Sequence, residues 1–293
     1  MESTTGPRNG EASLRTFFSD IKFEHSLFAL PFAYLGLFLA EGGWPRLSVF
    51  WGVTVAMISF RTFGMATNRL VDREIDLKNP RTKSRALPSA RLTGDFVRVA
   101  ALVSLLIFLM SAWVLRPVCF WLSPVPVFLA WLYPYLKRFT WLSHGALGII
   151  LGISPYGAWL ASGGSFSWVP GLLLIGVASW VTGFDIFYSL QDYEFDRNSG
   201  LESIPVRFGR PKALGAAGLL HVLALAAWAG TGALAGLGWI YAVGLIFVAG
   251  FLLREHWLVH RFGLAKMRQV FFTLNACVSF VVFIAAVSDL LWR

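Results

Sequence analysis

The sequence predicts an all-α protein that crosses a lipid bilayer about nine times. Of its 293 residues 56% are hydrophobic and only 14% are charged, a balance far from that of a soluble globular chain. Apolar runs of about twenty residues, the length with which a helix spans a bilayer, recur along the chain. The predicted spans cover residues 24–40, 47–68, 96–115, 118–135, 143–161, 168–190, 213–231, 239–253 and 269–291.

The remaining segments are too short to hold a soluble domain. Residues 23–293 are therefore predicted to form a single transmembrane domain, and residues 1–22 a cytoplasmic N-terminal tail. This tail lacks the short apolar core of a removable signal peptide. Cys119 and Cys277 lie in apolar runs without metal-ligand spacing, which favours a role in packing.

The net charge of +9 follows a membrane topology and does not indicate nucleic-acid binding. Most of the Lys and Arg residues fall in the N-terminal segment and in alternate loops, whereas the opposite loops hold Arg46, Arg116 and Arg293. Basic loops stay in the cytoplasm. The pattern predicts a cytoplasmic N-terminus, an external C-terminus and an integral protein of a bacterial inner membrane.

A first polar stripe ends the second predicted span. Asn68, Asp72 and Asp76 recur every four residues and share one helix face. Basic residues follow directly, including Arg81 and Arg85. Carboxylates beside a basic loop can hold a divalent cation and a phosphorylated ligand together. A solvated helix end with a positive cytoplasmic loop is the alternative interpretation.

A second polar stripe ends the sixth predicted span. Its members lie at i, i+3, i+7 and i+11: Asp185, Tyr188, Asp192 and Asp196. Glu74 and Glu194 lie off the two faces. Asp185 and Arg61 are both embedded in apolar sequence, where an ionisable group costs roughly 2.5–3.5 kcal/mol, so a functional role is expected. A structural buried ion pair is the alternative for these two.

The two acidic stripes are predicted to end on the same side of the membrane. Carboxylates gathered in one low-dielectric site repel one another unless cations neutralise them, which predicts a divalent metal. Tyr133 and Lys137, at i and i+4, could reach one phosphate, although an aromatic belt and an anchoring Lys-Arg pair would look the same. The histidines are predicted to be interfacial or packing residues: His25, His144, His221, His256 and His260.

These motifs resemble the UbiA superfamily of intramembrane prenyltransferases, and within it most closely the 4-hydroxybenzoate polyprenyltransferases. The first motif is carried by Arg61, Gly64, Asn68, Asp72, Asp76, Arg81, Thr82, Arg85, Leu87, Pro88 and Ser89. The second is carried by Asp185, Tyr188, Asp192, Asp196, Gly200, Ser203, Phe208 and Gly209. The loop between the fourth and fifth spans contributes Tyr133, Pro134, Lys137 and Arg138. The resemblance covers most of the chain and includes its helix count.

Three positions depart from the family pattern. Arg69 stands where many relatives carry a second acid, and Ala86 and Ala90 stand where a Pro and a Gly are usual. Residues 21–34 and 191–209 also resemble a subgroup associated with menaquinone made by the futalosine route. That subgroup would use a 1,4-dihydroxynaphthoate-type acceptor.

The resemblance implies Mg²⁺-dependent transfer of a polyprenyl group from its diphosphate to an aromatic hydroxy acid in quinone biosynthesis. The implied metal ligands are Asp72, Asp76, Asp192 and Asp196, which with Asp185 form the implied catalytic set. The implied diphosphate-binding residues are Arg61, Asn68, Arg81, Arg85, Tyr133 and Lys137. The C–O bond would ionise to an allylic cation, and a carboxylate such as Asp192 would take the ring proton. The implied partners are the two substrates and the bilayer, with no obligate protein partner.

Other functions fit parts of the pattern. An ion-coupled transporter also carries intramembrane acids, but its binding sites lie near the bilayer centre, whereas these acids cluster at one membrane face. A scaffold protein would not need two acidic stripes. Prenyl transfer to haem, chlorophyllide or a glycerol phosphate stays open.

Overall fold

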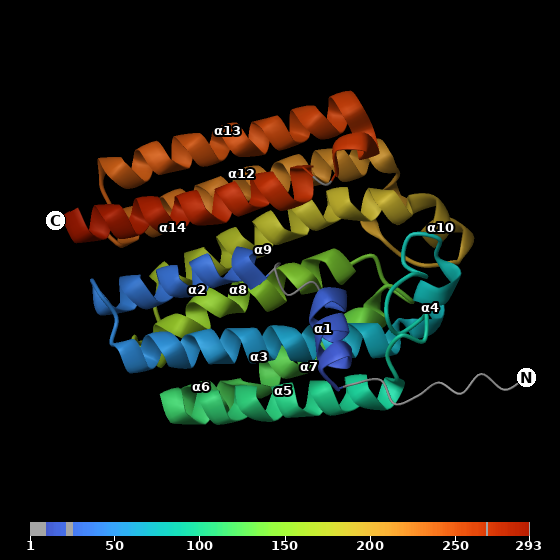
Figure 1. The fold of residues 1–293 in the computed structure, drawn as a ribbon. Helices are drawn as coiled ribbons and strands as arrows, with labels where there is room; N and C mark the ends of the chain where they lie inside the picture. Colours follow the sequence, from blue (N-terminus) through green and yellow to red (C-terminus); the bar gives the residue numbers. More distant parts are fainter. Residues whose placement is uncertain (1–9, 22–25, 268, 293) are drawn as a thin grey trace, which may run out of the picture.

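The computed structural model describes residues 10–21, 26–267 and 269–292 as a bundle of antiparallel helices, without any strand in those ranges (Figure 1). The long helices are α2 (Ser26–Glu41), α3 (Leu47–Val71), α5 (Gly94–Leu115), α7 (Pro124–Leu136), α8 (Ser143–Ala161), α9 (Trp168–Ser189), α12 (Arg210–Leu234), α13 (Trp239–Phe262) and α14 (Asn275–Trp292). The short ones are α1 (Gly10–Asp20), α4 (Arg73–Lys78), α6 (Pro117–Leu122), α10 (Tyr193–Asn198) and α11 (Ile204–Phe208). The fold class is the predicted one.

Each predicted span corresponds to a helix or to two consecutive helices. Within the described residues, seven segments are long and apolar enough to cross a membrane, and the apolar part of α2 is shorter. The fourth span is broken at Ser123 into α6 and α7, because a proline follows directly at position 124. The predicted class, an all-helical polytopic membrane bundle, is therefore confirmed.

The predicted end of the eighth span is wrong, and the ninth span begins with a different helix type. α13 continues to Phe262, nine residues beyond the predicted end, because Leu258 and Val259 are buried in a core cluster on its inner face. The ninth span opens with a π-helical segment, Gln269–Leu274, before α14. Charged residues such as Arg254 and Glu255 lowered the apparent hydrophobicity at the end of α13, but packing kept it helical.

Helix α9 lies at the centre of the bundle, packed against α8 on one side and α12 on the other. Trp180 is fully buried beside Trp228 and Phe32. Small residues bring α8 close: a Cβ on Gly148 would lie 2.3 Å from the carbonyl oxygen of Ala178. This close approach fixes the register of α8 against α9.

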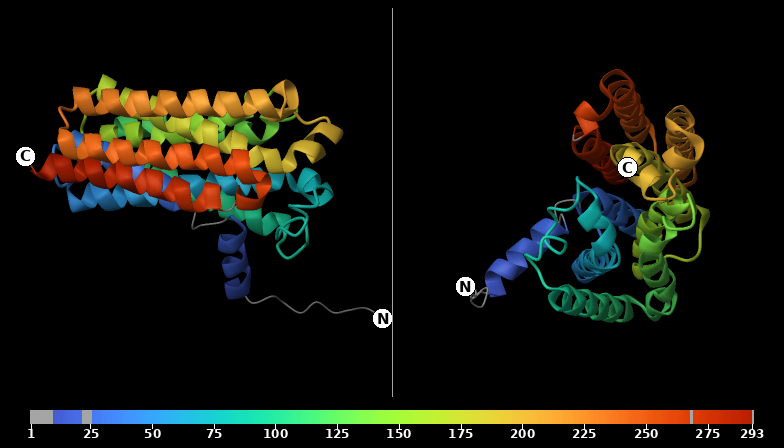
Figure 2. Two further views of the ribbon diagram at one scale, coloured as in Figure 1. Left: turned by 90° about the horizontal axis from the view of Figure 1, so that it is seen from above. Right: turned by 90° about the vertical axis from the view of Figure 1, so that its right-hand side faces the viewer.

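The short helices α4 and α10 gather at one end of the bundle, and the C-terminal end of α14 lies at the other (Figure 1). α1 runs across the long helices rather than along them (Figure 2). Within the predicted N-terminal tail, residues 10–20 form α1, which buries Phe17 in a core cluster that also contains Phe63 and Leu87.

Candidate active site

The first polar stripe lies at the junction of α3 and α4. Asp72 is the residue between them, with φ −90° and ψ 3°. Helical hydrogen bonds continue through it, because the Asp72 N–H donates to Asn68 O and the Asp76 N–H donates to Asp72 O. The Asn68 side chain donates to Asp72 Oδ2 at 3.0 Å. Both aspartates are buried, so the predicted shared face exists across a helix break.

The second stripe has the same local geometry. α9 ends at Ser189, a 3₁₀ turn covers Leu190–Asp192, and α10 follows. Asp192 precedes α10 with φ −101° and ψ 3°, nearly the backbone conformation of Asp72. Each stripe thus bends at an aspartate, Asp72 or Asp192, and a short helix carries the last aspartate of each.

Arg81 joins the two stripes. Its Nε donates to Asp192 Oδ1 at 2.8 Å, its Nη2 donates to Asp192 Oδ2, and its Nη1 donates to the Tyr188 hydroxyl at 2.9 Å. Asn79 Nδ2 also donates to Asp192 Oδ1, at 2.9 Å. Residues of the basic loop that follows α4 thus hold the second stripe beside the first, and both stripes lie at one end of the bundle (Figure 1).

Basic side chains also neutralise the first stripe. Lys137 Nζ lies 2.6 Å from Asp72 Oδ2, and Arg85 Nη1 lies 2.7 Å from Asp76 Oδ2. Burial raises the pKa of the Asp72 carboxyl, and the charge of Lys137 opposes that rise. The backbone N–H of Glu202 donates to the Lys137 carbonyl at 2.7 Å, which anchors the end of α7 to the loop after α10.

Deeper in the bundle, Asp185 pairs with His144. His144 Nδ1 and Asp185 Oδ2 are 2.7 Å apart, and both side chains are largely buried. Tyr133 lies within electrostatic range of Asp185 and Asp72, and Arg61 is half-buried on α3. The prediction of His144 as a packing residue is wrong, because its ring is hydrogen-bonded to Asp185. The two residues are 41 positions apart and lie on different helices, α8 and α9, so no spacing in the sequence indicates the pair.

Two further histidines are also more than packing residues. His221 Nδ1 and His256 Nε2 lie 3.0 Å apart, on α12 and α13. Their contact was missed for the same reason, since the two helices contribute one histidine each. Neither histidine is in the group of residues around the acidic stripes.

Asp20 of α1 is hydrogen-bonded to two residues near the first stripe. Its Oδ2 accepts a hydrogen bond from Arg69 Nε at 3.1 Å, and its Oδ1 accepts one from the Ala86 N–H at 2.6 Å. A proline at position 86 has no N–H to donate. Two of the three departures from the family pattern, Arg69 and Ala86, are thus partners of the same carboxylate.

The acids off the stripes lie outside this network. Glu74 is exposed, and Glu194 is exposed beside Arg210, 2.9 Å from its Nη2. Both positions agree with the prediction that Glu74 and Glu194 lie off the two polar faces. They are natural controls for the aspartates.

The carboxylates fit a metal that is shared with a substrate. Among the described residues no group of three or more His, Cys, Asp and Glu is arranged to hold a metal alone. Mg²⁺ commonly binds through one or two carboxylates together with substrate phosphate oxygens, and each stripe ends with two aspartates. The donor chemistry therefore suits Mg²⁺ bound with a diphosphate.

Comparison with known proteins places this geometry in a family. The UbiA prenyltransferase family matches residues 29–277. The 4-hydroxybenzoate octaprenyltransferase of Edwardsiella ictaluri is 34% identical over 209 residues, 70% of this chain and 72% of the relative. The one of Serratia proteamaculans is 32% identical over 196 residues, 66% of this chain and 67% of the relative.

Solved structures agree. The apo structure of a UbiA homolog from Aeropyrum pernix is 30% identical, covers 91% of this chain and 98% of its own, and superposes with a TM-score of 0.83. A UbiA homolog from Archaeoglobus fulgidus, bound to GPP and Mg²⁺, is 17% identical over 93% of this chain and 99% of its own, with a TM-score of 0.71, and shares the fold. The chain therefore belongs to the UbiA prenyltransferase family and is a polyprenyltransferase.

Proposed function

We propose that the protein transfers a polyprenyl group from its diphosphate to an aromatic hydroxy acid of the 4-hydroxybenzoate type, in quinone biosynthesis. The observation that carries this proposal is the junction of the two acidic stripes through Arg81 and Asp192. It gathers carboxylates and basic groups at one end of the bundle. The names of the curated relatives support the acceptor class.

The chain's own residues would hold the diphosphate. Arg81, Arg85 and Lys137 now pair with Asp192, Asp76 and Asp72, and on substrate binding they would turn their donors to phosphate oxygens. Tyr133 would donate one hydrogen bond, and Arg61 and Asn68 would add polar contacts. Mg²⁺ held by Asp72, Asp76, Asp192 and Asp196 would neutralise the charge that develops on the leaving diphosphate.

Cleavage of the C–O bond leaves an allylic cation that the electron-rich ring attacks next to its hydroxyl. Buried aromatic side chains such as Trp180 and Phe184 pack around α9, and such apolar walls would keep water from the cation. Water would convert the cation to a useless prenol. The basic loops support a site at the cytoplasmic face and a cytoplasmic N-terminus.

A 1,4-dihydroxynaphthoate-type acceptor is the second candidate. It is favoured by the resemblance of residues 21–34 and 191–209 to the futalosine-route subgroup. The same transfer chemistry applies to either ring.

Purified protein in nanodiscs, supplied with labelled polyprenyl diphosphate and Mg²⁺, tests the proposal against both acceptors. We expect a C-prenylated ring product from 4-hydroxybenzoate. Product from the dihydroxynaphthoate alone would select the second candidate. Product from neither ring would contradict the proposed function.

A further inference from the structure

His144 has a nitrogen without a partner in a buried setting. Because a carboxylate only accepts hydrogen bonds, His144 Nδ1 donates to Asp185, and in a neutral imidazole Nε2 is then the acceptor. Nε2 is buried and has no hydrogen-bond partner. The Nδ1 contact with Asp185, at 2.7 Å, fixes the orientation of the ring. An orphaned buried acceptor is costly, so a group absent from the free protein accounts for it best.

The position of His144 in the bundle indicates which group would be the partner of Nε2. Asp185 precedes Asp192 by seven residues, which places it roughly 10 Å deeper along the helix axis. His144 is within electrostatic range of Asp196, and Tyr133 is within range of both Asp185 and Asp72. An aromatic ring that attacks the allylic carbon next to the diphosphate would lie at a depth between Asp192 and Asp185.

We propose that His144 accepts the hydroxyl proton of the aromatic acceptor and that Asp185 is the positioning residue that fixes its tautomer. This inference rests on the proposed function. The hydroxyl proton moves to Nε2 as the ring carbon forms its bond to the prenyl carbon, and the C–O electron pair leaves with the diphosphate. The resulting dienone then loses its ring proton to a carboxylate, and His144 returns its proton to the oxygen. One proton is released in total.

Varying the acidity of the acceptor's hydroxyl group distinguishes proton transfer to His144 from a purely structural role of this residue. His144→Gln keeps an amide donor for Asp185 but cannot take a proton, so kcat should fall by roughly 100-fold or more on the unsubstituted acceptor. Ring fluorination, which makes the hydroxyl more acidic, should shrink the wild-type to variant ratio step by step. Binding of a prenyl S-thiolodiphosphate should stay unchanged. His260→Gln, an exposed histidine on α13, is the matched control and should behave as wild type.

A ratio that stays constant across the fluorinated series would overturn the inference. The inference would also be overturned if the wild-type to variant ratio of kcat changed only with acceptors that lack the carboxylate, and not with fluorination. If His144→Gln does not accumulate, Asp185→Asn tests the same trend, with a smaller expected loss. Wild-type protein that transfers no prenyl group to any ring would refute the proposed function itself, which is a separate result.

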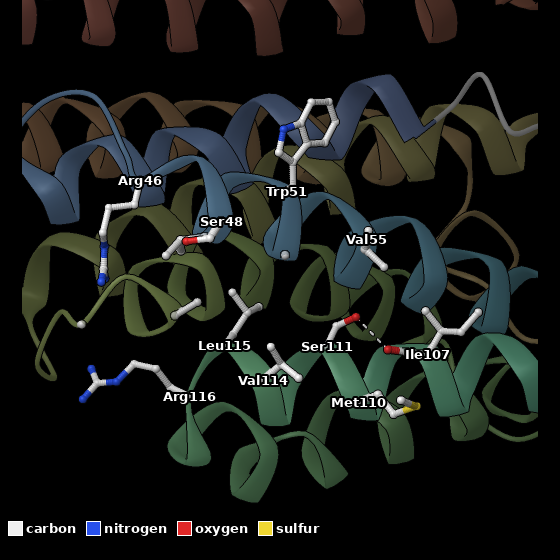
Figure 3. Close-up of a pocket in the computed structure, with 14 residues that line it drawn as sticks. Arg46, Ser48, Trp51, Val55, Ile107, Met110, Ser111, Val114, Leu115 and Arg116 are labelled. Atoms are coloured by element: carbon white, nitrogen blue, oxygen red, sulfur yellow. Dashed lines mark hydrogen bonds between the residues drawn. The ribbon is translucent and has the colours of Figure 1, made fainter.

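A different observation concerns the opposite end of the bundle. A groove of about 780 Å³ lies between α3 and α5. Figure 3 shows Arg46 and Arg116 at one end of the groove, with aliphatic side chains such as Val55, Ile107 and Val114 along the rest. Since α3 has 25 residues, this end is roughly 37 Å from Asp72.

The groove has the charge pattern of a phospholipid site. Arg46 and Arg116 are two of the three basic residues that the charge pattern assigns to the outer loops. Arg46 lies 3.5 Å from Glu41 through its Nε, and Arg116 donates one long hydrogen bond to Leu160 O at 3.4 Å. Both keep further guanidinium donors for a phosphate. We infer that the groove binds an anionic phospholipid, with its head group at the arginines and an acyl chain along the aliphatic wall.

Thermal unfolding in nanodiscs tests this site without an activity assay. Phosphatidylglycerol in place of phosphatidylcholine should raise the Tm of the wild type by at least about 3 °C. The double variant Arg46→Gln with Arg116→Gln should lose that increase, whereas Arg254→Gln, an exposed arginine elsewhere, should keep it. Equal Tm values in the two lipids, or an increase that survives in the double variant, would overturn the site. An increase caused by free phosphate alone would contradict a lipid occupant.

Discussion

Arg81 donates two hydrogen bonds to Asp192, a residue 111 positions further along the chain. The guanidinium occupies carboxylate oxygens that would face a diphosphate and its metal. Lys137 and Arg85 do the same at Asp72 and Asp76. Three of the four aspartates thus have basic partners in the free site, and substrate binding is expected to exchange these partners.

The basic residues should act on one substrate only. Arg81→Ala, Arg85→Ala or Lys137→Ala removes a charge-assisted contact worth about 1.5–3 kcal/mol. Each should weaken binding of the prenyl diphosphate by roughly tenfold or more and leave the acceptor KM nearly unchanged. Steady-state kinetics with each substrate varied in turn measures both, with Arg73→Ala, an exposed residue of α4, as the control. An increase in acceptor KM alone would show that these residues read the acceptor.

The four aspartates should behave as one unit. Asp72→Asn, Asp76→Asn, Asp192→Asn or Asp196→Asn should each cut turnover by orders of magnitude. Residues that act together are strongly non-additive, so Asp72→Asn with Asp192→Asn should be little worse than either change alone. Turnover per monodisperse protein is the measurement. Glu74→Gln and Glu194→Gln should stay near wild type, and comparable losses there would refute the helical-face argument.

The Asp20–Arg69 pair should stabilise the fold. Both side chains are less than a tenth exposed, and removal of one partner of a buried pair costs about 3–5 kcal/mol. Asp20→Ala should therefore lower the unfolding temperature clearly. Asp95→Ala, at an exposed pair with Arg98, should cost less than about 1 kcal/mol. Equal effects in thermal unfolding would contradict a specific role for the buried pair.

Ala90 should be improved by glycine. Its φ of 56° is in the left-handed region, which costs a non-glycine residue roughly 1–2 kcal/mol. Ala90→Gly should raise stability in the same unfolding measurement. Ala100→Gly, in the interior of α5, should instead lower it by about 1 kcal/mol. A destabilising Ala90→Gly would mean that the backbone strain is not relieved there.

The features that could be predicted from the sequence are those that depend on local periodicity. Twenty-residue apolar runs predicted the bundle, and four-residue spacing placed Asp72 and Asp76 on one face. The bends at Asp72 and Asp192 could not be predicted, because the side-chain spacing along each stripe is the same whether or not the helix breaks there. The partners of His144 and Arg69 come from distant helices, and only tertiary packing brings them together. The end of α13 was misjudged because burial of Leu258 and Val259 outweighs the charged residues beside them.

The central claim is that the two acidic stripes hold the diphosphate together through divalent metal. Calorimetric titration of the protein in nanodiscs with a prenyl S-thiolodiphosphate, with Mg²⁺ and then with EDTA, tests it most directly. We predict tight binding with Mg²⁺, a loss of roughly 100-fold or more in affinity without it, and the same loss in Asp72→Asn and in Asp192→Asn. Equal affinity with and without Mg²⁺, or a loss in one stripe's variant alone, would contradict the claim.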